Sequence, residues 1–159
     1  MTVQEAKIKL YRFCAYQERC HQEVESKLYD LGIRGDEADE IIHHLIIEGF
    51  LNEERFAKAF SNGKFRLKHW GRLKIINELE QRNLSKHCIQ AGLKEIGEDE
   101  YIHALRNLFA KKVPGIEADN IFTLRDRLSR YAIQKGFEAD LVWRELKNLF
   151  PDKTQLPLK

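Results

Sequence analysis

Three short stretches of the chain repeat one pattern at a spacing of about fifty residues. In each, an apolar helical segment ends at a glycine or asparagine, which reach the left-handed backbone conformation at low cost, and an apolar residue follows. The stretches are Leu28-x-x-Leu31-Gly32-Ile33, Leu79-x-x-Arg82-Asn83-Leu84 and Ala132-x-x-Lys135-Gly136-Phe137, so the cap residues lie 51 and 53 positions apart. A period near 50 that spans short helices indicates a tandem helical repeat rather than a single globule.

Apolar residues recur at helical spacing in about nine segments, three in each repeat, and no strand pattern competes with them. We therefore predict an all-α fold of three three-helix repeats, stacked into an elongated, curved array. Three helices of this length bury little apolar surface alone, so neighbouring repeats are expected to share apolar faces. The predicted units are three-helix repeats over residues 1–51, 52–97 and 98–151, followed by a C-terminal tail over 152–159.

Capping residues mark where the predicted helices begin and end. Thr2-Val-Gln-Glu5 has the capping-box pattern of a helix start. Gly49 and Asn52 place a helix stop beside a helix start, which we interpret as the joint between the first and second repeats. In the third repeat, Val113-Pro-Gly-Ile116 interrupts a helical pattern.

The composition is that of an ordinary folded domain, with 33% charged and 43% hydrophobic residues. No apolar run approaches the roughly 20 residues that span a bilayer, and the N-terminus has no apolar secretion segment. We therefore expect a cytoplasmic protein without membrane contact. Cys14, Cys20 and Cys88 form no Cys-x-x-Cys pair, which disfavours a zinc site and fits reduced thiols.

Positive charge is concentrated in the second repeat. Residues 52–97 hold ten basic and five acidic side chains, a net charge of +5, whereas residues 1–51 carry −4 and residues 98–159 carry +1. No acidic residue occurs between Arg55 and Asn77. A solvated helix surface usually mixes both signs, so this clustering favours contact with a negatively charged partner such as nucleic acid. The basic residues concerned are Arg55, Lys58, Lys64, Arg66, Lys68, Arg72 and Lys74.

A helix that begins after Asn52 and continues to Arg72 would be amphipathic. Its inward stripe is expected to hold Phe56, Phe60, Gly63, Leu67 and Trp70. The opposite face would hold Lys58, Lys68 and Arg72, where cations neutralise phosphates. Phe65 falls in the middle of this basic face, where an exposed ring can stack on an unpaired base or contact a partner. The alternative for Phe65 is packing against a neighbouring repeat.

We find no motif that carries catalysis. The chain has no glycine-rich phosphate loop, no Gly-x-Ser-x-Gly and no His-Glu-x-x-His. The acidic stretches at 36–40 and 98–100 lie at helix starts, where carboxylates stabilise the helix dipole. A magnesium-dependent nuclease built on these acids is a minor alternative. We expect a protein that is not an enzyme and that uses no cofactor and no metal.

The chain resembles the bacterial RecX regulatory proteins. The resemblance lies in Gly49-Phe-Leu-Asn52-Glu-Glu-Arg55-Phe56-Ala57, in Trp70-Gly71-Arg72-x-Lys74-Ile75 with Glu78-Leu79, and in Arg19-x-x-x-Glu23 and Lys27-Leu28-x-x-Leu31-Gly32. It covers nearly the whole chain and weakens after Gly97. Cys20 stands where the family commonly has a serine helix cap.

The resemblance implies a non-enzymatic regulator of RecA recombinase in DNA repair and recombination. Such a protein binds the RecA–DNA filament and inhibits its ATPase, strand-exchange and co-protease activities. The implied partners are RecA and single- or double-stranded DNA without sequence preference, met by a monomer through the seven basic residues. The alternatives are a sequence-independent DNA-binding helical module that acts without RecA, and a plain helical scaffold.

Overall fold

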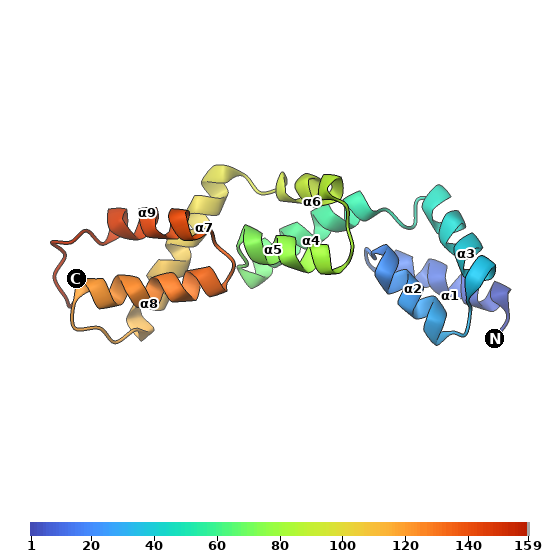
Figure 1. Ribbon diagram of the computed structural model, residues 1–159, viewed down its shortest axis with the longest axis horizontal. Coiled ribbons are helices and arrows are strands. Elements are labelled where there is room, and N and C mark those ends of the chain that lie inside the picture. The colour runs from blue at the N-terminus through green and yellow to red at the C-terminus, as the bar shows by residue number, and fades with distance from the viewer. Residues whose placement is uncertain (159) are drawn as a thin grey trace. The chain divides into compact units, whose positions relative to one another are not determined.

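The computed structural model describes residues 1–158 of the chain. Within these residues the regular structure is entirely helical (Figure 1), which confirms the predicted all-α fold. A single 3₁₀ turn, η1 (Val113–Gly115), interrupts the third repeat where the Val-Pro-Gly sequence predicted a break. The helices are α1 (Val3–Tyr16), α2 (His21–Asp30), α3 (Gly35–Ile47), α4 (Glu53–Lys68), α5 (Arg72–Gln81), α6 (Lys86–Leu93), α7 (Glu98–Lys112), α8 (Ile121–Gln134) and α9 (Ala139–Leu149).

Side-chain caps begin α1 and α4 as the sequence predicts. The Thr2 hydroxyl accepts a hydrogen bond from the Glu5 amide at 3.1 Å, and the Glu5 carboxylate accepts one from the Thr2 nitrogen at 3.3 Å. At the start of α4, Asn52 Oδ1 accepts from the Arg55 amide at 2.9 Å. Each cap satisfies an amide that has no partner inside its helix.

The ends of α2, α5 and α8 share one backbone geometry. Their cap residues Gly32, Asn83 and Gly136 have φ angles of 79°, 61° and 103°. In each, the amide of the following apolar residue donates to a carbonyl five positions earlier: Ile33 to Leu28 at 3.0 Å, Leu84 to Leu79 at 3.2 Å and Phe137 to Ala132 at 3.1 Å. The repeated sequence pattern is therefore a repeated three-dimensional structure.

The described chain forms two compact units. The first comprises Met1–Ser61 and Glu78–Glu95, and the second comprises Asn62–Asn77 with the segment that begins at Ile96. The N-terminal part of α4 and the C-terminal part of α5 belong to the first unit, and their other parts belong to the second. The three repeat boundaries at 51, 97 and 151 remain a prediction.

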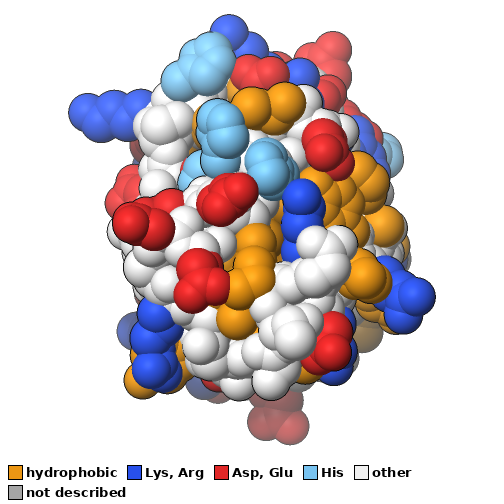
Figure 2. Space-filling model, turned by 90° about the vertical axis from the view of Figure 1, so that its right-hand side faces the viewer, with side chains coloured by type: hydrophobic (Ala, Val, Ile, Leu, Met, Phe, Trp, Pro, Cys, Tyr) orange, Lys and Arg blue, Asp and Glu red, His pale blue; other side chains and the backbone are white. Residues whose placement is uncertain are grey.

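In the first unit, α1, α2 and α3 pack against one another (Figure 1). Their core contains Leu10, Val24, Leu28 and Leu45, all buried. Acidic, basic, histidine and apolar side chains are interspersed on the face shown in Figure 2. Mixed charge of this kind is typical of an ordinary solvated surface.

A close backbone approach joins α4 and α6 in the same unit. A methyl group on Gly92 would lie 2.7 Å from the Ala57 carbonyl oxygen and 2.7 Å from Ser61 Oγ. Ala57 and Ser61 are both fully buried. The contact therefore requires a glycine on α6 and small side chains on α4, and it fixes which face of α4 points inward.

Tyr101, on α7, is the centre of the second unit and is 0% exposed. Its ring centroid lies 5.8 Å from that of Phe65 and 5.0 Å from that of Phe137. These rings connect the last turns of α4 with α7 and with the loop between α8 and α9. Within residues 1–158, no helix has the length and apolar content needed to cross a membrane.

Candidate nucleic-acid interface

Helix α4 ends at Lys68 and does not continue to Arg72 as the amphipathic pattern had suggested. His69 adopts a left-handed conformation with φ of 59°, which turns the chain out of the helix. The Trp70 amide then donates to the Lys64 carbonyl at 3.0 Å and closes the turn. The segment from His69 to Gly71 is therefore a loop, and the basic residues on its two sides do not share one helix face.

This loop packs backbone to backbone against the loop between α8 and α9. The Gly71 amide donates to the Lys135 carbonyl at 2.8 Å, and the Leu73 amide donates to the Gly136 carbonyl at 2.9 Å. A methyl group on Gly71 would lie closer than 3.0 Å to the Gly136 backbone, and one on Gly136 would lie 2.8 Å from the Lys74 nitrogen. Two glycines are therefore required where the loops meet.

The contact brings together lysines from α4, from α5 and from the loop that follows α8. Lys135 Nζ donates to the Lys68 carbonyl at 2.9 Å. Burial, and then the charges of Lys74 and Lys68, lower the pKa of Lys135 below its ordinary value of 10.5. Lys64 Nζ and Lys74 Nζ lie 4.9 Å and 4.6 Å from the Trp70 ring centroid. We call Lys64, Lys68, Lys74 and Lys135, with Trp70 between them, the lysine cluster.

Like charges held this close repel one another unless an anion neutralises them. In the described part of the chain, no carboxylate lies within ion-pair distance of Lys68, Lys74 or Lys135. A phosphate group would neutralise the cluster and accept hydrogen bonds from the ammonium groups. The geometry is therefore suited to a polyanion such as a nucleic-acid backbone.

Arg72, by contrast, is part of a half-buried network in the second unit. Its guanidinium forms ion pairs with Glu98 and, at 2.9 Å, with Glu138, and it lies 3.8 Å from the Tyr101 ring centroid. Its amide donates to the Tyr101 hydroxyl at 2.9 Å, and that hydroxyl donates to Glu138. Burial and the Glu138 carboxylate raise the pKa of Tyr101 far above its ordinary value. Arg72 therefore holds the second unit together.

Three of the basic residues predicted for the site have carboxylate or carbonyl partners elsewhere in the fold. Arg66 donates to both carboxylate oxygens of Glu100, at 2.9 and 3.1 Å. In the first unit, Arg55 pairs with Glu18 at 2.6 Å and donates to the Gly49 carbonyl at 2.9 Å, where it caps the end of α3. Lys58 Nζ lies 3.9 Å from Glu54, one helical turn away. The structure therefore gathers Lys64, Lys68 and Lys74 into one place and sets Arg55 and Lys58 in the other unit.

The outward position expected for Phe65 is wrong. Phe65 is 3% exposed and packs on Tyr101, whereas Leu67, expected inside, is 78% exposed. Phe56, also expected inside, is buried, but the buried face of α4 extends from it through Ala57, about 100° further round the helix, and Ser61, which both contact α6. Phe65 follows Ser61 by one turn and is thus buried. A ring buried in this way cannot stack on a base from the surface of the basic face.

Sequence reasoning also missed how Lys135 relates to the other lysines. Lys135 precedes the cap glycine Gly136 in the third copy of the repeated pattern. This position beside a helix cap was the one sequence feature that distinguished Lys135. What the pattern could not show is that this cap packs on Gly71.

The buried thiols add no chemistry here, because burial raises the pKa of Cys14 and of Cys20 to about 11.

Comparison with known proteins gives one family. The family model described as "RecX, second three-helix domain" matches residues 52–93. "Regulatory protein RecX" of Pseudomonas savastanoi pv. phaseolicola is 30% identical over 135 residues, which cover 83% of each chain. "Regulatory protein RecX" of Bacillus cytotoxicus is 23% identical over 151 residues, 95% of this chain.

The fold agrees with solved structures of the same family. The crystal structure of RecX from Lactobacillus salivarius superimposes with a TM-score of 0.83 at 20% identity, covering 92% of this chain and 96% of that one. This chain spans 56% of the length of the Bacillus cytotoxicus relative and 64% of that from Finegoldia magna, less than two thirds of each. From the identity and coverage shared with the Pseudomonas relative, and from the common fold, we conclude that the chain belongs to the RecX family of regulatory proteins.

Proposed function

We propose that the chain is a regulator of RecA recombinase that binds the RecA–DNA filament and inhibits its ATPase, strand-exchange and co-protease activities. Membership of the RecX family supports RecA as the partner. The lysine cluster is the observation that carries the DNA part of the proposal, because Lys68, Lys74 and Lys135 converge without carboxylate partners. Contacts of this kind are made to phosphate groups, which are the same in every sequence, so single and double strands should bind without sequence preference.

The proposed mode of action needs no catalytic step by this chain. A ligand that binds two states of a protein unequally stabilises the state that it binds more tightly. A protein bound to the filament can change the activity of RecA in this way. We propose that it acts in the cytoplasm as a monomer, with no cofactor. The cations that contact phosphate are proposed to be Lys64, Lys68 and Lys74 together with Lys135, and the paired arginines are proposed to serve the fold.

The test is DNA-dependent ATP hydrolysis by RecA on preformed filaments with DNA in excess. We expect inhibition by amounts of this protein well below those of RecA, since a filament ligand acts on many subunits. The triple variant K68A/K74A/K135A should need about tenfold more protein. The matched control K9A/K86A/K147A removes three exposed lysines elsewhere and should inhibit like the unchanged protein. Full inhibition by the first triple variant would contradict the assignment of the cluster.

A second candidate function rests on the same cluster. A DNA-binding module that acts without RecA would bind bare strands and lower RecA activity only by sequestering DNA. In that case the inhibition disappears when DNA is added in excess, whereas a filament regulator remains effective. Adding DNA in steps at fixed RecA therefore separates the two functions.

A further inference from the structure

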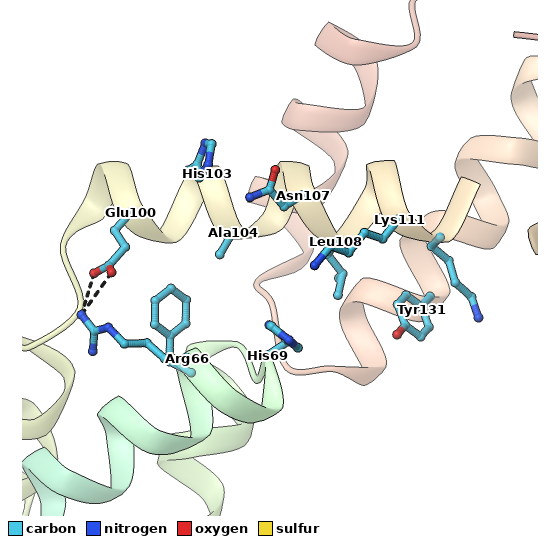
Figure 3. Close-up of a pocket in the computed structure, with 11 residues that line it drawn as sticks. Arg66, His69, Glu100, His103, Ala104, Asn107, Leu108, Lys111 and Tyr131 are labelled. Carbon is cyan, nitrogen blue, oxygen red and sulfur yellow. Dashed lines mark hydrogen bonds and ion pairs between the residues drawn. The ribbon is translucent and has the colours of Figure 1, made fainter. Parts of the chain in front are cut away.

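A cavity of about 360 Å³ opens in the second unit between the last turn of α4, α7 and α8 (Figure 3). Its lining includes the side chains of Phe65, Ala104, Leu108 and Tyr131. Figure 3 shows Ala104 and Leu108 extending from α7 toward Arg66 and His69, while His103 lies on the other side of that helix. The volume is within the range of about 300–1,000 Å³ that is usual for ligand sites.

Cations surround this apolar lining. Lys112 Nζ lies 4.5 Å from the Tyr131 ring centroid, and Arg66 extends along the opposite edge with its guanidinium bonded to Glu100. Lys111, which is exposed, also lines the cavity. Three cations and one carboxylate give the edge a positive balance. A ligand with an apolar, flat part and a negatively charged part would suit both regions.

The cavity continues the lysine cluster along two walls. His69 lines the cavity and directly follows Lys68. Tyr131 lines it from α8 and lies one helical turn before Lys135, whose ammonium group is bonded to the Lys68 carbonyl. A chain molecule whose phosphates contact Lys68 and Lys135 therefore lies close to residues that line the cavity.

We propose that this cavity accommodates one unstacked base of a single-stranded nucleic acid whose phosphates lie on the lysine cluster. The Tyr131 ring offers a flat surface on which a base of any sequence can stack, and Ala104 and Leu108 add apolar side chains to the lining. The inference rests on the DNA contact of the proposed function, and it adds a site that distinguishes single strands from double strands. Bases of an intact duplex are already stacked and paired and cannot enter.

The choice of a base over an acidic peptide with an apolar side chain follows from continuity with the lysine cluster. A strand repeats phosphate and base at short, regular intervals, so one strand can occupy adjacent phosphate and base sites. A peptide would have to place several carboxylates on the cluster and a large side chain in the cavity at an unrelated spacing. The experiment below separates these two occupants.

Binding of two strands of equal length and charge tests the inference. Fluorescence anisotropy would compare oligothymidylate with an abasic strand that has the same number of phosphates. We expect oligothymidylate to bind about tenfold more tightly, which is the effect of stacking one base. Ala104→Trp fills the cavity and should bring oligothymidylate to the abasic affinity without changing the abasic affinity. K68A/K135A should weaken both strands by one common factor.

Each result has a distinct meaning. Equal affinity of the two strands for the unchanged protein overturns the base site but leaves the phosphate contact standing. Binding of neither strand contradicts the DNA part of the proposed function as well. A fluorescent acidic peptide containing one phenylalanine gives the third result. If the unchanged protein binds this peptide, Ala104→Trp does not, and the two strands bind with equal affinity, the cavity belongs to a protein partner instead.

A second measurement uses the unchanged protein and so does not depend on the folding of Ala104→Trp. A strand containing 5-bromodeoxyuridine is irradiated in the complex, and the attached peptide is identified by mass spectrometry. We expect the attachment on the cavity lining, at His69 or Tyr131. Attachment confined to Trp70 or to the first unit would overturn the proposal.

Discussion

Gly71 and Gly136 lie in direct backbone contact, so that a side chain on either one would overlap the other's loop. The amide of Gly71 donates to the carbonyl of Lys135, the neighbour of Gly136, at 2.8 Å. This contact places Lys135 beside Lys68 and Lys74. The proposed phosphate site is therefore a consequence of two residues that have no side chains.

Gly71→Ala should destabilise the protein. The added methyl overlaps backbone rather than a flexible side chain, so the loops must separate, at a cost of about 2–3 kcal/mol. Gly63→Ala is the matched control, because a methyl at Gly63 meets no atom and alanine favours a helix interior by about 0.5–1 kcal/mol. Thermal unfolding should show opposite shifts for the two variants. Equal melting temperatures would contradict the contact.

The helix ends could be predicted from the sequence because they depend on local chemistry. Gly32, Asn83 and Gly136 adopt the left-handed conformation that their residue types favour, and the apolar residue after each donates the expected hydrogen bond. A cap involves only the few residues around it. The repeat, and with it the all-α fold, follows from such local signals.

The inward face of α4 and the partners of the arginines could not be predicted in this way. The face depends on Gly92, which is 35 residues after Ala57 and allows α6 to approach. Arg72 meets carboxylates 26 and 66 residues away, at Glu98 and Glu138. A run of basic residues shows where positive charge is available, but only the tertiary contacts show which of these charges are already neutralised.

Substitution of Arg72 should lower the stability of the fold, whereas substitution of Lys68 should weaken DNA binding. Arg72→Ala leaves Glu138 without its guanidinium partner at a position where the arginine side chain is only 22% exposed, and should cost about 2 kcal/mol. Lys68→Ala should leave the free energy of unfolding nearly unchanged. The slope of log DNA affinity against log salt concentration should show the reverse pattern. It should fall by about one for Lys68→Ala and stay unchanged for Arg72→Ala. Urea unfolding and binding titrations at several salt concentrations check both.

The pKa of Lys135 should depend on its neighbours. Because the charges of Lys74 and Lys68 lower this pKa, Lys74→Ala should raise it toward 10.5, and NMR titration of the Lys135 side chain would measure the change. The folded protein holds the Lys135 proton less tightly than the unfolded chain does, so this residue's contribution to stability should rise with pH up to about its ordinary pKa of 10.5. An unchanged titration in Lys74→Ala would show that the two ammonium groups do not interact.

Removing the partner of Arg66 should strengthen DNA binding. Glu100→Ala removes the ion-pair partner of Arg66, which precedes Lys68 by two residues, and removes one negative charge from the second unit. We expect an affinity gain of about threefold, in proportion to the small energy of an exposed ion pair. Glu25→Ala removes an exposed carboxylate from the first unit and serves as the control. If both variants gain equally, the effect comes from net charge and not from Arg66.

The most direct test of the lysine cluster is the slope of log affinity against log salt concentration for single-stranded DNA. Each phosphate contact contributes a slope of about 0.7, so K68A/K74A/K135A should reduce the slope by about 2. K9A/K86A/K147A, which removes the same charge from other exposed positions, should keep the slope of the unchanged protein. An equal reduction in both triple variants would contradict a localised phosphate site and leave only a general effect of net charge.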